Sequence, residues 1–452
     1  MAVTAAAMDR IGDQSRPAVD LPAFIDAQPV GRGQVTLLLL CAAILFVDGF
    51  DTQAIGYVAP AVAREWGLAR GALGPVFSAS LFGLMLGALT MGPLADRVGR
   101  KRIVILSTLA FGIGTLATLL AQDTTSLLVI RFLTGLGLGG AMPNAVALTA
   151  EFSPHRRRAT MVMLMFCGFS VGAAVGGLIA AALIPSFGWR AVFLVGGLAP
   201  LLLCPVLIFR LPESARFLAL SGRADDRIAA SLGRIFPQQL FPPGTRFGAN
   251  EPRLIGLPVM HLFREHRGVV TALFWVVFFM SLLDLYFLSN WLPTVLNDLG
   301  ASDSAAAIVG SMLQVGGVVG TLVLGRFIDR FSFRALTLIY ALAAVAIVAI
   351  GYSGHAIGLA AVAIFAAGFC IVGGQIAANA LTATFYPTAI RASGVGWALG
   401  VGRAGSIIGP LVGGALLAMH WQTQPLFVVA AVPALCAAAA AYALTHVTRP
   451  GA

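Results

Sequence analysis

The stretch Leu45–Pro60 reads LFVDGFDTQAIGYVAP and decides the fold. It belongs to an apolar segment that begins near Val35 and is long enough to cross a membrane as a helix. Two carboxylates, Asp48 and Asp51, interrupt this segment, and their spacing places both on one helix face. A charged side chain at the centre of a bilayer costs from about 2.5 to more than about 10 kcal/mol. We therefore expect this face to border a water-filled path, a partner charge or a bound proton, as part of a transport path.

The composition of the chain indicates a polytopic helical membrane protein. Of its 452 residues, 58% are hydrophobic and 11% are charged, and the mean hydropathy is +0.90. A soluble protein of this length would need a larger polar surface. The net charge of +10 comes largely from cations in short loops, where they fix the orientation of a membrane protein, so we expect no nucleic-acid partner.

The residues give no sign of an enzyme or of a bound cofactor. All five cysteines lie in apolar segments without the spacing of metal ligands, and the sequence has no nucleotide-binding loop or plausible catalytic triad. We therefore expect no catalytic residues, no metal and no cofactor. A sensor that binds a ligand without moving it is a further alternative, which the absence of a signalling segment disfavours.

Twelve apolar segments are long enough to span a bilayer, and a polar stretch separates the first six from the last six. The expected spans are 35–58, 71–95, 103–121, 126–150, 159–183, 190–210, 268–292, 305–327, 334–352, 356–384, 391–417 and 424–446. We predict an all-α polytopic membrane protein with two six-helix bundles. Its parts are a cytoplasmic tail (1–33), the first bundle (34–210), a cytoplasmic linker (211–267), the second bundle (268–446) and a cytoplasmic tail (447–452). Because the expected outer loops keep only Arg64, Arg70 and Arg190 of the 29 cations, both termini are expected in the cytoplasm.

An internal repeat relates the two halves of the chain. Residues 233 positions apart agree along six segments, as in Asp51 and Asp284, and in Gly83 and Gly316. Two halves in the same orientation imply a pseudo-two-fold axis along the membrane normal and a binding site between the halves near the midplane. Asp284 is then expected at the depth of Asp51, either as a second proton site or as a partner of Arg403.

A charged loop follows the second segment. It reads Gly92-Pro-Leu-Ala-Asp96-Arg97-Val-Gly99-Arg100-Lys101-Arg102, and a degraded copy, Gly325–Arg330, follows the eighth segment. This loop resembles the inner-loop signature of the major facilitator superfamily, and the repeat resembles the architecture of that superfamily over the whole chain.

The resemblance implies an ion-pair network that opens and closes the inner side of the protein. The alternative is that these charges only fix the orientation of the protein in the membrane. The candidate gating residues are Gly92, Asp96, Arg97, Gly99, Arg100, Glu151, Arg158, Glu213, Arg216, Asp329, Arg330 and Arg391. Because Thr384 stands where the repeat would place a second Glu151, we expect a weaker network in the second half.

Four stretches carry a closer resemblance, and the tail segment Phe24–Arg32 agrees with it. They are Asp48–Asp51, Arg131–Asn144, Met165–Phe169, and Phe385–Arg391 leading to Gly402–Gly405. They resemble the aromatic acid:proton symporters of the superfamily, and 4-hydroxybenzoate and protocatechuate carriers most. The resemblance implies import of a small aromatic carboxylate with protons by alternating access, driven by the proton gradient. We also expect the protein to lie in the bacterial plasma (inner) membrane and to work as a monomer, although the sequence does not give the oligomeric state. Another organic anion (gentisate, 3-hydroxybenzoate or a pyridine carboxylate) and export remain alternatives.

The charged and polar residues inside the expected spans are the site candidates. Helix arithmetic allows Arg131 to share the depth of the two aspartates, so we expect it to be their charge partner; a static pair that only ties the two helices together is the alternative. The candidate proton-coupling residues are Asp48, Asp51 and Asp284.

Arg403 has no neutralising neighbour in the sequence, and its guanidinium matches a carboxylate in two hydrogen bonds, so we expect it to bind the substrate. Further substrate-binding candidates, each of which could instead only pack or bridge helices, are Arg131, Asn144, Phe169, Gln375, Asn379 and Trp397.

Overall fold

The computed structural model of the protein describes a chain built almost wholly of helices. The described residues are 19–221, 225–242, 244–248, 260, 262–263, 267–354, 356–386 and 388–448, without the side chains of residues 326, 329, 388, 389, 391 and 392. Twelve helical segments in this part are long and apolar enough to cross a membrane, which confirms the predicted number. In lipid a helix satisfies its own backbone hydrogen bonds, which is why each long apolar run takes this form.

The first half of the chain contains six long helices and the linker. Its elements are β1 (Val19–Asp20), α2 (Leu21–Ala27), α3 (Arg32–Glu65), α4 (Gly74–Val98), α5 (Arg100–Ala117) with a 3-10 turn (Thr118–Leu120), α6 (Thr124–Glu151), α7 (His155–Phe187), α8 (Arg190–Arg210), α9 (Ala215–Leu220), α10 (Asp225–Ile235) and β2 (Phe247–Gly248).

The second half contains the other six spans. Its elements are α11 (Gly268–Asp298), α12 (Asp303–Tyr352), α13 (Ile357–Phe385), α14 (Thr388–Ala418) and α15 (Thr423–Val447). α12 holds two spans, Asp303–Gly325 and Arg330–Tyr352, and is kinked at Ser332, whose φ is 47°. The bounds of the predicted spans differ from the observed ones by seven residues at most, at the end of the first span.

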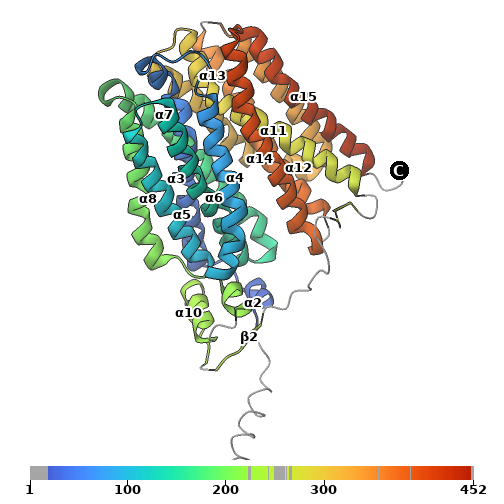
Figure 1. The fold of residues 1–452 in the computed structure, drawn as a ribbon. Coiled ribbons are helices and arrows are strands. Elements are labelled where there is room, and N and C mark those ends of the chain that lie inside the picture. Colours follow the sequence, from blue (N-terminus) through green and yellow to red (C-terminus); the bar gives the residue numbers. More distant parts are fainter. Residues whose placement is uncertain are drawn as a thin grey trace, which may run out of the picture.

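The tail and the linker pack together at one end of the first bundle. β1 pairs with β2 in parallel, with Val19 opposite Phe247. α10 contacts the start of α3, where a Cβ on Gly33 would lie 2.1 Å from the carbonyl oxygen of Ile235. We call the end of the molecule that carries α2 and α10 the linker face, and the opposite end the far face (Figure 1).

The repeat in the sequence is also a repeat in the packing. α3 packs on α7 as α11 packs on α14, and α4 packs on α6 as α12 packs on α13. At equivalent positions, a Cβ on Gly83 would lie 2.1 Å from the carbonyl oxygen of Phe132, and a Cβ on Gly316 would lie 2.1 Å from that of Phe365. Small residues thus let the backbones approach at the same places in both bundles.

The two bundles meet through α3, α4 and α7 of the first and α11, α12 and α14 of the second. A Cβ on Gly74 would lie 3.1 Å from the carbonyl oxygen of Pro410, and a Cβ on Gly177 would lie 2.8 Å from that of Ala307, which is the symmetry-related contact. Gly56 packs on Ser289, which is its image in the repeat. A Cβ on Gly56 would lie 2.7 Å from the carbonyl oxygen of Ser289.

Ion pairs also join the halves at the far face. Arg64 pairs with Asp303, and Arg70 pairs with Asp298. The ribbons of the two bundles lie close together toward the far face and diverge toward the linker face (Figure 1). The structure therefore represents a state in which the halves are closed together at the far face.

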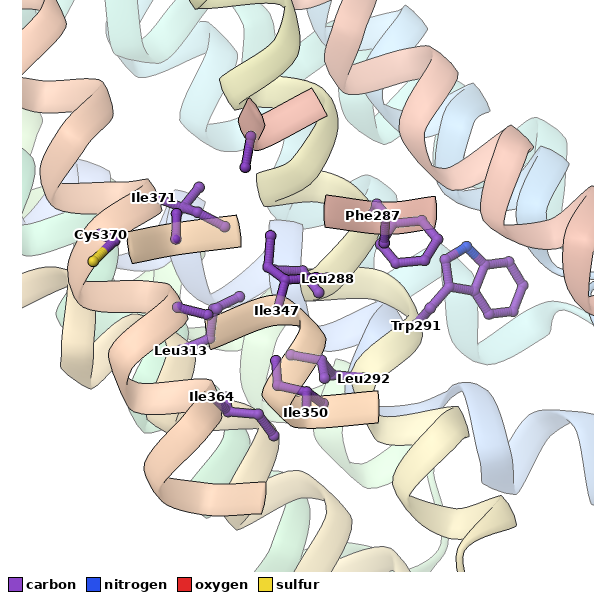
Figure 2. Packing of buried hydrophobic residues seen from close by; sticks show 14 of the residues in the cluster. Phe287, Leu288, Trp291, Leu292, Leu313, Ile347, Ile350, Ile364, Cys370 and Ile371 are labelled. Carbon is purple, nitrogen blue, oxygen red and sulfur yellow. The ribbon is translucent and has the colours of Figure 1, made fainter. Parts of the chain in front are cut away.

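A hydrophobic core fills the second bundle and continues between the halves. Phe287, Trp291, Leu313, Ile347 and Ile364 are part of it (Figure 2). The indole nitrogen of Trp291 donates to the carbonyl oxygen of Pro410 at 3.0 Å, so the polar edge of this ring is satisfied inside the core. This packing fixes α11 against α14, the helices that carry Asp284 and Arg403.

Candidate functional site

Asp51 on α3 forms a fully buried ion pair with Arg131 on α6. Nη1 of Arg131 lies 3.0 Å from Oδ1 of Asp51, and Nη2 lies 2.8 Å from Oδ2. The hydroxyl of Thr115 on α5 donates to the same Oδ1 at 2.6 Å. The guanidinium lies over the ring of Phe193 on α8, 5.6 Å from its centroid. The predicted ion pair is confirmed for Asp51, and it ties together four helices of the first bundle.

Asp48 lies in a different environment, although it is also fully buried. Its Oδ1 accepts a hydrogen bond from Thr52 at 3.1 Å, and its Oδ2 has no partner among the described residues. The two aspartates are about 60° apart around the helix and about 4.5 Å apart along it, so Arg131 reaches only one of them. This corrects the expectation that Arg131 is the partner of both.

Arg403 on α14 lies where the two halves meet. Its Nη1 lies 3.4 Å from the hydroxyl of Tyr286 on α11, and its Nη2 lies 3.5 Å from the sulfur of Met142 on α6. No carboxylate in the described part of the chain forms an ion pair with it. Since it is only partly buried, its charge is available to a ligand.

Asp48 and Arg403 lie in opposite halves, close enough for their side chains to interact electrostatically with each other and with the hydroxyl of Tyr286, although they form no direct ion pair in the described part of the chain. We call Asp48, Tyr286 and Arg403 the central polar group. A small hydrophobic cluster lies directly beside it, where Leu81 and Leu282 pack on Tyr286. A cation, a carboxyl group and apolar side chains therefore meet at one place between the halves.

Asp284 on α11 is the image of Asp51 but has no such partner. Both of its carboxyl oxygens are buried without a hydrogen bond among the described residues. The repeat would place Arg131 at Ile364 and Thr115 at Val348, two apolar residues. Asp284 forms no ion pair with Arg403 in the described part of the chain. The hydroxyl of Tyr340 lies near it, and this hydroxyl is also buried without a hydrogen-bond partner among the described residues.

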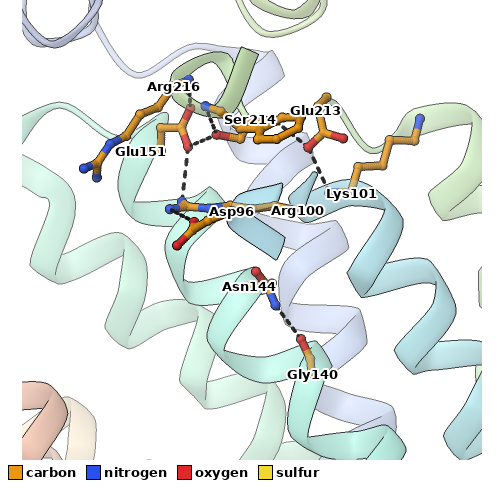
Figure 3. A network of polar contacts seen from close by, with 10 residues as sticks. Asp96, Arg100, Lys101, Gly140, Asn144, Glu151, Glu213, Ser214 and Arg216 are labelled. Carbon is orange, nitrogen blue, oxygen red and sulfur yellow. Dashed lines mark hydrogen bonds and ion pairs between the residues drawn. The ribbon is translucent and has the colours of Figure 1, made fainter. Parts of the chain in front are cut away.

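The remaining substrate-binding candidates lie in varied places. The amide of Asn144 donates to the carbonyl oxygen of Gly140 in its own helix at 2.8 Å (Figure 3). Phe169 lies at a close approach of α7 to α3, where a Cβ on Gly49 would lie 2.1 Å from its carbonyl oxygen. Gln375 has both amide atoms buried without a partner in the described part, and the same holds for Oδ1 of Asn379.

Trp397 lies apart from the central polar group. Its ring stacks on Trp275 at a centroid distance of 6.0 Å and is 46% exposed. A spacing of six residues turns it about 120° away from Arg403 around α14. The structure therefore does not bring Trp397 to Arg403.

An ion-pair network lies at the linker face of the first bundle (Figure 3). Glu151 at the end of α6 accepts from Nη1 of Arg100 at 3.3 Å, from the hydroxyl of Ser214 at 2.6 Å and from the backbone amide of Arg216 at 2.8 Å. Asp96 adds a looser contact with Arg100 at 3.8 Å. The network joins α4, α5 and α6 to α9.

Glu213 forms the second centre of this network. Its Oε1 accepts from the backbone amides of Lys101 and Ser214, each at 3.0 Å. Gly99 has a φ of 110°, and a Cβ there would lie 2.4 Å from Oε2 of Glu213, so both its conformation and its space favour glycine.

The other gating candidates contribute less to this network. A Cβ on Gly92 would meet nothing within 4 Å, Arg97 is exposed, and Nε of Arg158 has no partner in the described part. In the second half, Arg330 lies over the ring of Phe331, 5.4 Å from its centroid. Thr384 donates to Leu381 in its own helix at 2.8 Å. The side chains of Asp329 and Arg391 lie outside the described residues.

The sequence did not single out several residues that complete the site. The hydroxyl groups of Thr115 and Thr52 donate to Asp51 and Asp48, the hydroxyl of Tyr340 lies near Asp284, and no motif marks these three residues. One signal was present: Thr52 follows Asp48 by four residues and therefore lies on the same helix face.

Known proteins resemble this chain over nearly its whole length. The sequence model of the Major Facilitator Superfamily matches residues 41–273 and 274–452. The chain is 43% identical to the 4-hydroxybenzoate transporter PcaK of Pseudomonas aeruginosa, over 94% of this chain and 96% of that protein. It is 43% identical to a gallate transporter of Pseudomonas putida, over 95% of this chain and 97% of that protein. Among solved structures, the xylose transporter XylE of E. coli, in a partially occluded inward-open conformation, shares the fold with a TM-score of 0.71 and 17% identity, over 90% of this chain and 97% of that one.

Proposed function

The chain belongs to the major facilitator superfamily, and from this premise we propose that it imports an aromatic carboxylate together with protons. As a member of this superfamily it is a multi-pass membrane transporter and not an enzyme. The substrate class is supported by relatives that are named for the transport of 4-hydroxybenzoate and gallate, both phenolic benzoates.

The observation that carries the proposal is Arg403 in the central polar group. Its guanidinium has no carboxylate partner in the described part of the chain and lies beside Tyr286 between the halves. The guanidinium of Arg403 can bind a substrate carboxylate through two hydrogen bonds, while Leu81 and Leu282 next to Tyr286 suit an aromatic ring.

Asp48 couples the proton to the substrate in this proposal. A charged Asp48 neutralises Arg403 across the interface, whereas a protonated Asp48 leaves the charge of Arg403 for the substrate. Proton and anion therefore bind together and leave together, which is the requirement for symport. The Asp51–Arg131 pair holds the helix that carries Asp48 in place, and it is the second coupling candidate of the first half.

Asp284 is proposed as a further proton site. A buried carboxylate without a partner is costly, so the neutral acid is the form that these surroundings stabilise. Asp284→Asn, which imitates that form, is expected to lower the number of protons moved per substrate without unfolding the protein. The proton-to-substrate ratio in proteoliposomes measures this, and an unchanged ratio would exclude Asp284 from coupling.

Transport would proceed by alternating access. With the linker face in the cytoplasm of a bacterial inner membrane, as the loop cations favour, the observed state faces inward. The network of Arg100, Glu151 and Glu213 would then gate the inner side, and the far-face ion pairs would gate the outer side.

Asn144, Phe169, Gln375 and Asn379 remain proposed substrate contacts. A monomer suffices, because both halves of the site lie in one chain.

The test is uptake of labelled 4-hydroxybenzoate by proteoliposomes with an imposed inward proton gradient. We expect accumulation that an uncoupler abolishes. Accumulation of gentisate, 3-hydroxybenzoate or a pyridine carboxylate instead would reassign the substrate, and loss of preloaded acid against its gradient would indicate an exporter. No movement of any of these acids under either gradient would overturn the proposal.

A further inference from the structure

A basic pocket lies on the linker face of the first bundle, away from the central polar group. Its volume is about 260 Å³, and it lies between α5 and the linker helices. Four cations line it, Lys101 and Arg102 from α5 and Arg227 and Arg234 from α10. These two segments are more than a hundred residues apart in the sequence, so the fold brings the charges together.

The positive charge in this pocket is not balanced. Among its described lining residues Glu213 is the one carboxylate, and its Oε1 is already bound to two backbone amides. None of the four cations forms an ion pair with a carboxylate in the described part of the chain. Lys101 lies close enough to interact with the like charge of Arg234 and with the opposite charge of Glu213, and an anion between the two cations would relieve their repulsion.

The frame around the cations is firmly packed. Ile228 and Leu232 of α10 are buried against the first bundle, and the hydroxyl of Ser231 donates to the carbonyl oxygen of Glu213 at 2.6 Å. Apolar side chains, Val98 and Phe217 among them, form the rest of the wall. The helices that carry the four cations are thus fixed relative to each other, so the cations border one pocket together.

The pocket borders the part of the surface that faces lipid. Nζ of Lys101 donates to the carbonyl oxygen of Ile208 at the end of α8, at 2.7 Å. The side chains of Ile208 and Phe209 there are 47% and 76% exposed, as expected for residues that contact acyl chains. A phosphate in the pocket is therefore next to the place where its acyl chains would lie.

We propose that this pocket binds a phosphate-bearing anion, supplied by an anionic phospholipid headgroup or as free phosphate. Arginine and lysine are the side chains that proteins use for phosphate, and those on a cytoplasmic face also attract anionic lipids. Because the pocket joins α10 to the start of α5, the bound anion ties the linker to the first bundle.

The test compares lipid binding by purified full-length variants in detergent, using native mass spectrometry and thermal unfolding. The pocket variant is Arg227→Gln/Arg234→Gln. The matched control is Arg32→Gln/Arg157→Gln, which removes two exposed cations of the linker face outside the pocket. The probes are phosphatidylglycerol, phosphatidylcholine as the zwitterionic control, and inorganic phosphate.

We expect phosphatidylglycerol to bind the wild-type protein and the control alike, and to bind the pocket variant about tenfold or more weakly. Displacement of the lipid by millimolar phosphate would identify the pocket as a general phosphate site, and resistance to it would identify a lipid site. Equal phosphatidylglycerol affinity of wild type and pocket variant, or an equal loss in the control, would overturn the proposal. Since binding is measured without transport, the result is independent of the proposed function.

Discussion

At Arg403 a substitution can change the shape of the cationic group without changing its charge. Arg403→Lys keeps the positive charge but loses the planar fork that holds a carboxylate in two hydrogen bonds. We expect KM for the aromatic acid to rise about tenfold or more, equivalent to about 1.4 kcal/mol. Initial uptake rates in proteoliposomes measure this, with the exposed Arg157→Lys as the control. An unchanged KM would rule out direct recognition by Arg403.

Asp48 and Asp51 are expected to respond differently to the same substitution. Asp51→Asn leaves Arg131 buried without its counter-charge, which costs about 3–5 kcal/mol and lowers Tm. Asp48→Asn breaks no ion pair, so Tm should change little while proton-driven accumulation is lost. Thermal unfolding and uptake are measured on the same preparations. Equal losses of stability in the two variants would contradict this assignment.

The sequence could predict the buried charges but not all of their partners. The depth of Arg131 follows from counting residues, and the structure pairs it with Asp51. Which aspartate it meets depends on the rotation of α3 in the bundle, and no local pattern records that rotation. The contacts of Arg403 with Tyr286 and Met142 depend on how the two halves dock, which is a property of the whole fold.

Among the helices, the repeated glycine contacts make a prediction about stability. Gly83→Ala and Gly316→Ala each insert a methyl group 2.1 Å from a backbone oxygen of the neighbouring helix, so one helix must move. We expect each to cost about 1–3 kcal/mol and to lower Tm similarly. Gly400→Ala in α14 is the control, because a Cβ there meets nothing within 4 Å and alanine favours a helix. Unchanged Tm in both test variants would contradict the packing described here.

The helices themselves were predictable because lipid demands long apolar runs, and their bounds agree to within seven residues. The pairing of β1 with β2 was not predictable, because strands of two residues carry no periodicity. The break between the two spans of α12 was predicted, but its position at Ser332 was not, since serine does not mark a left-handed backbone in a sequence.

For the molecule as a whole, the far-face ion pairs are expected to favour the observed state. Both cations come from the first half and both anions from the second, so Arg64→Ala/Arg70→Ala removes attraction between the halves. We expect this variant to open more often at the far face. Ser78→Cys reports this, because Ser78 is buried between the halves and donates to Ile407 at 2.7 Å.

A membrane-impermeant maleimide should therefore label Ser78→Cys faster in the double variant. Arg190→Ala is the matched control, because it breaks an ion pair with Glu65 inside the first half on the same face. The protein without Ser78→Cys gives the background from its own cysteines. Equal labelling rates in the double variant and the control would show that these pairs do not hold the halves together.

The contact of Gly56 with Ser289 has a consequence for the history of the chain. Because each is the image of the other in the repeat, the contact lies on the pseudo-two-fold axis. In a dimer of two identical half-length ancestors, the residue at this position would have touched its own copy. In such a dimer a large side chain there would clash with its own copy, and both positions of the present chain carry a small residue.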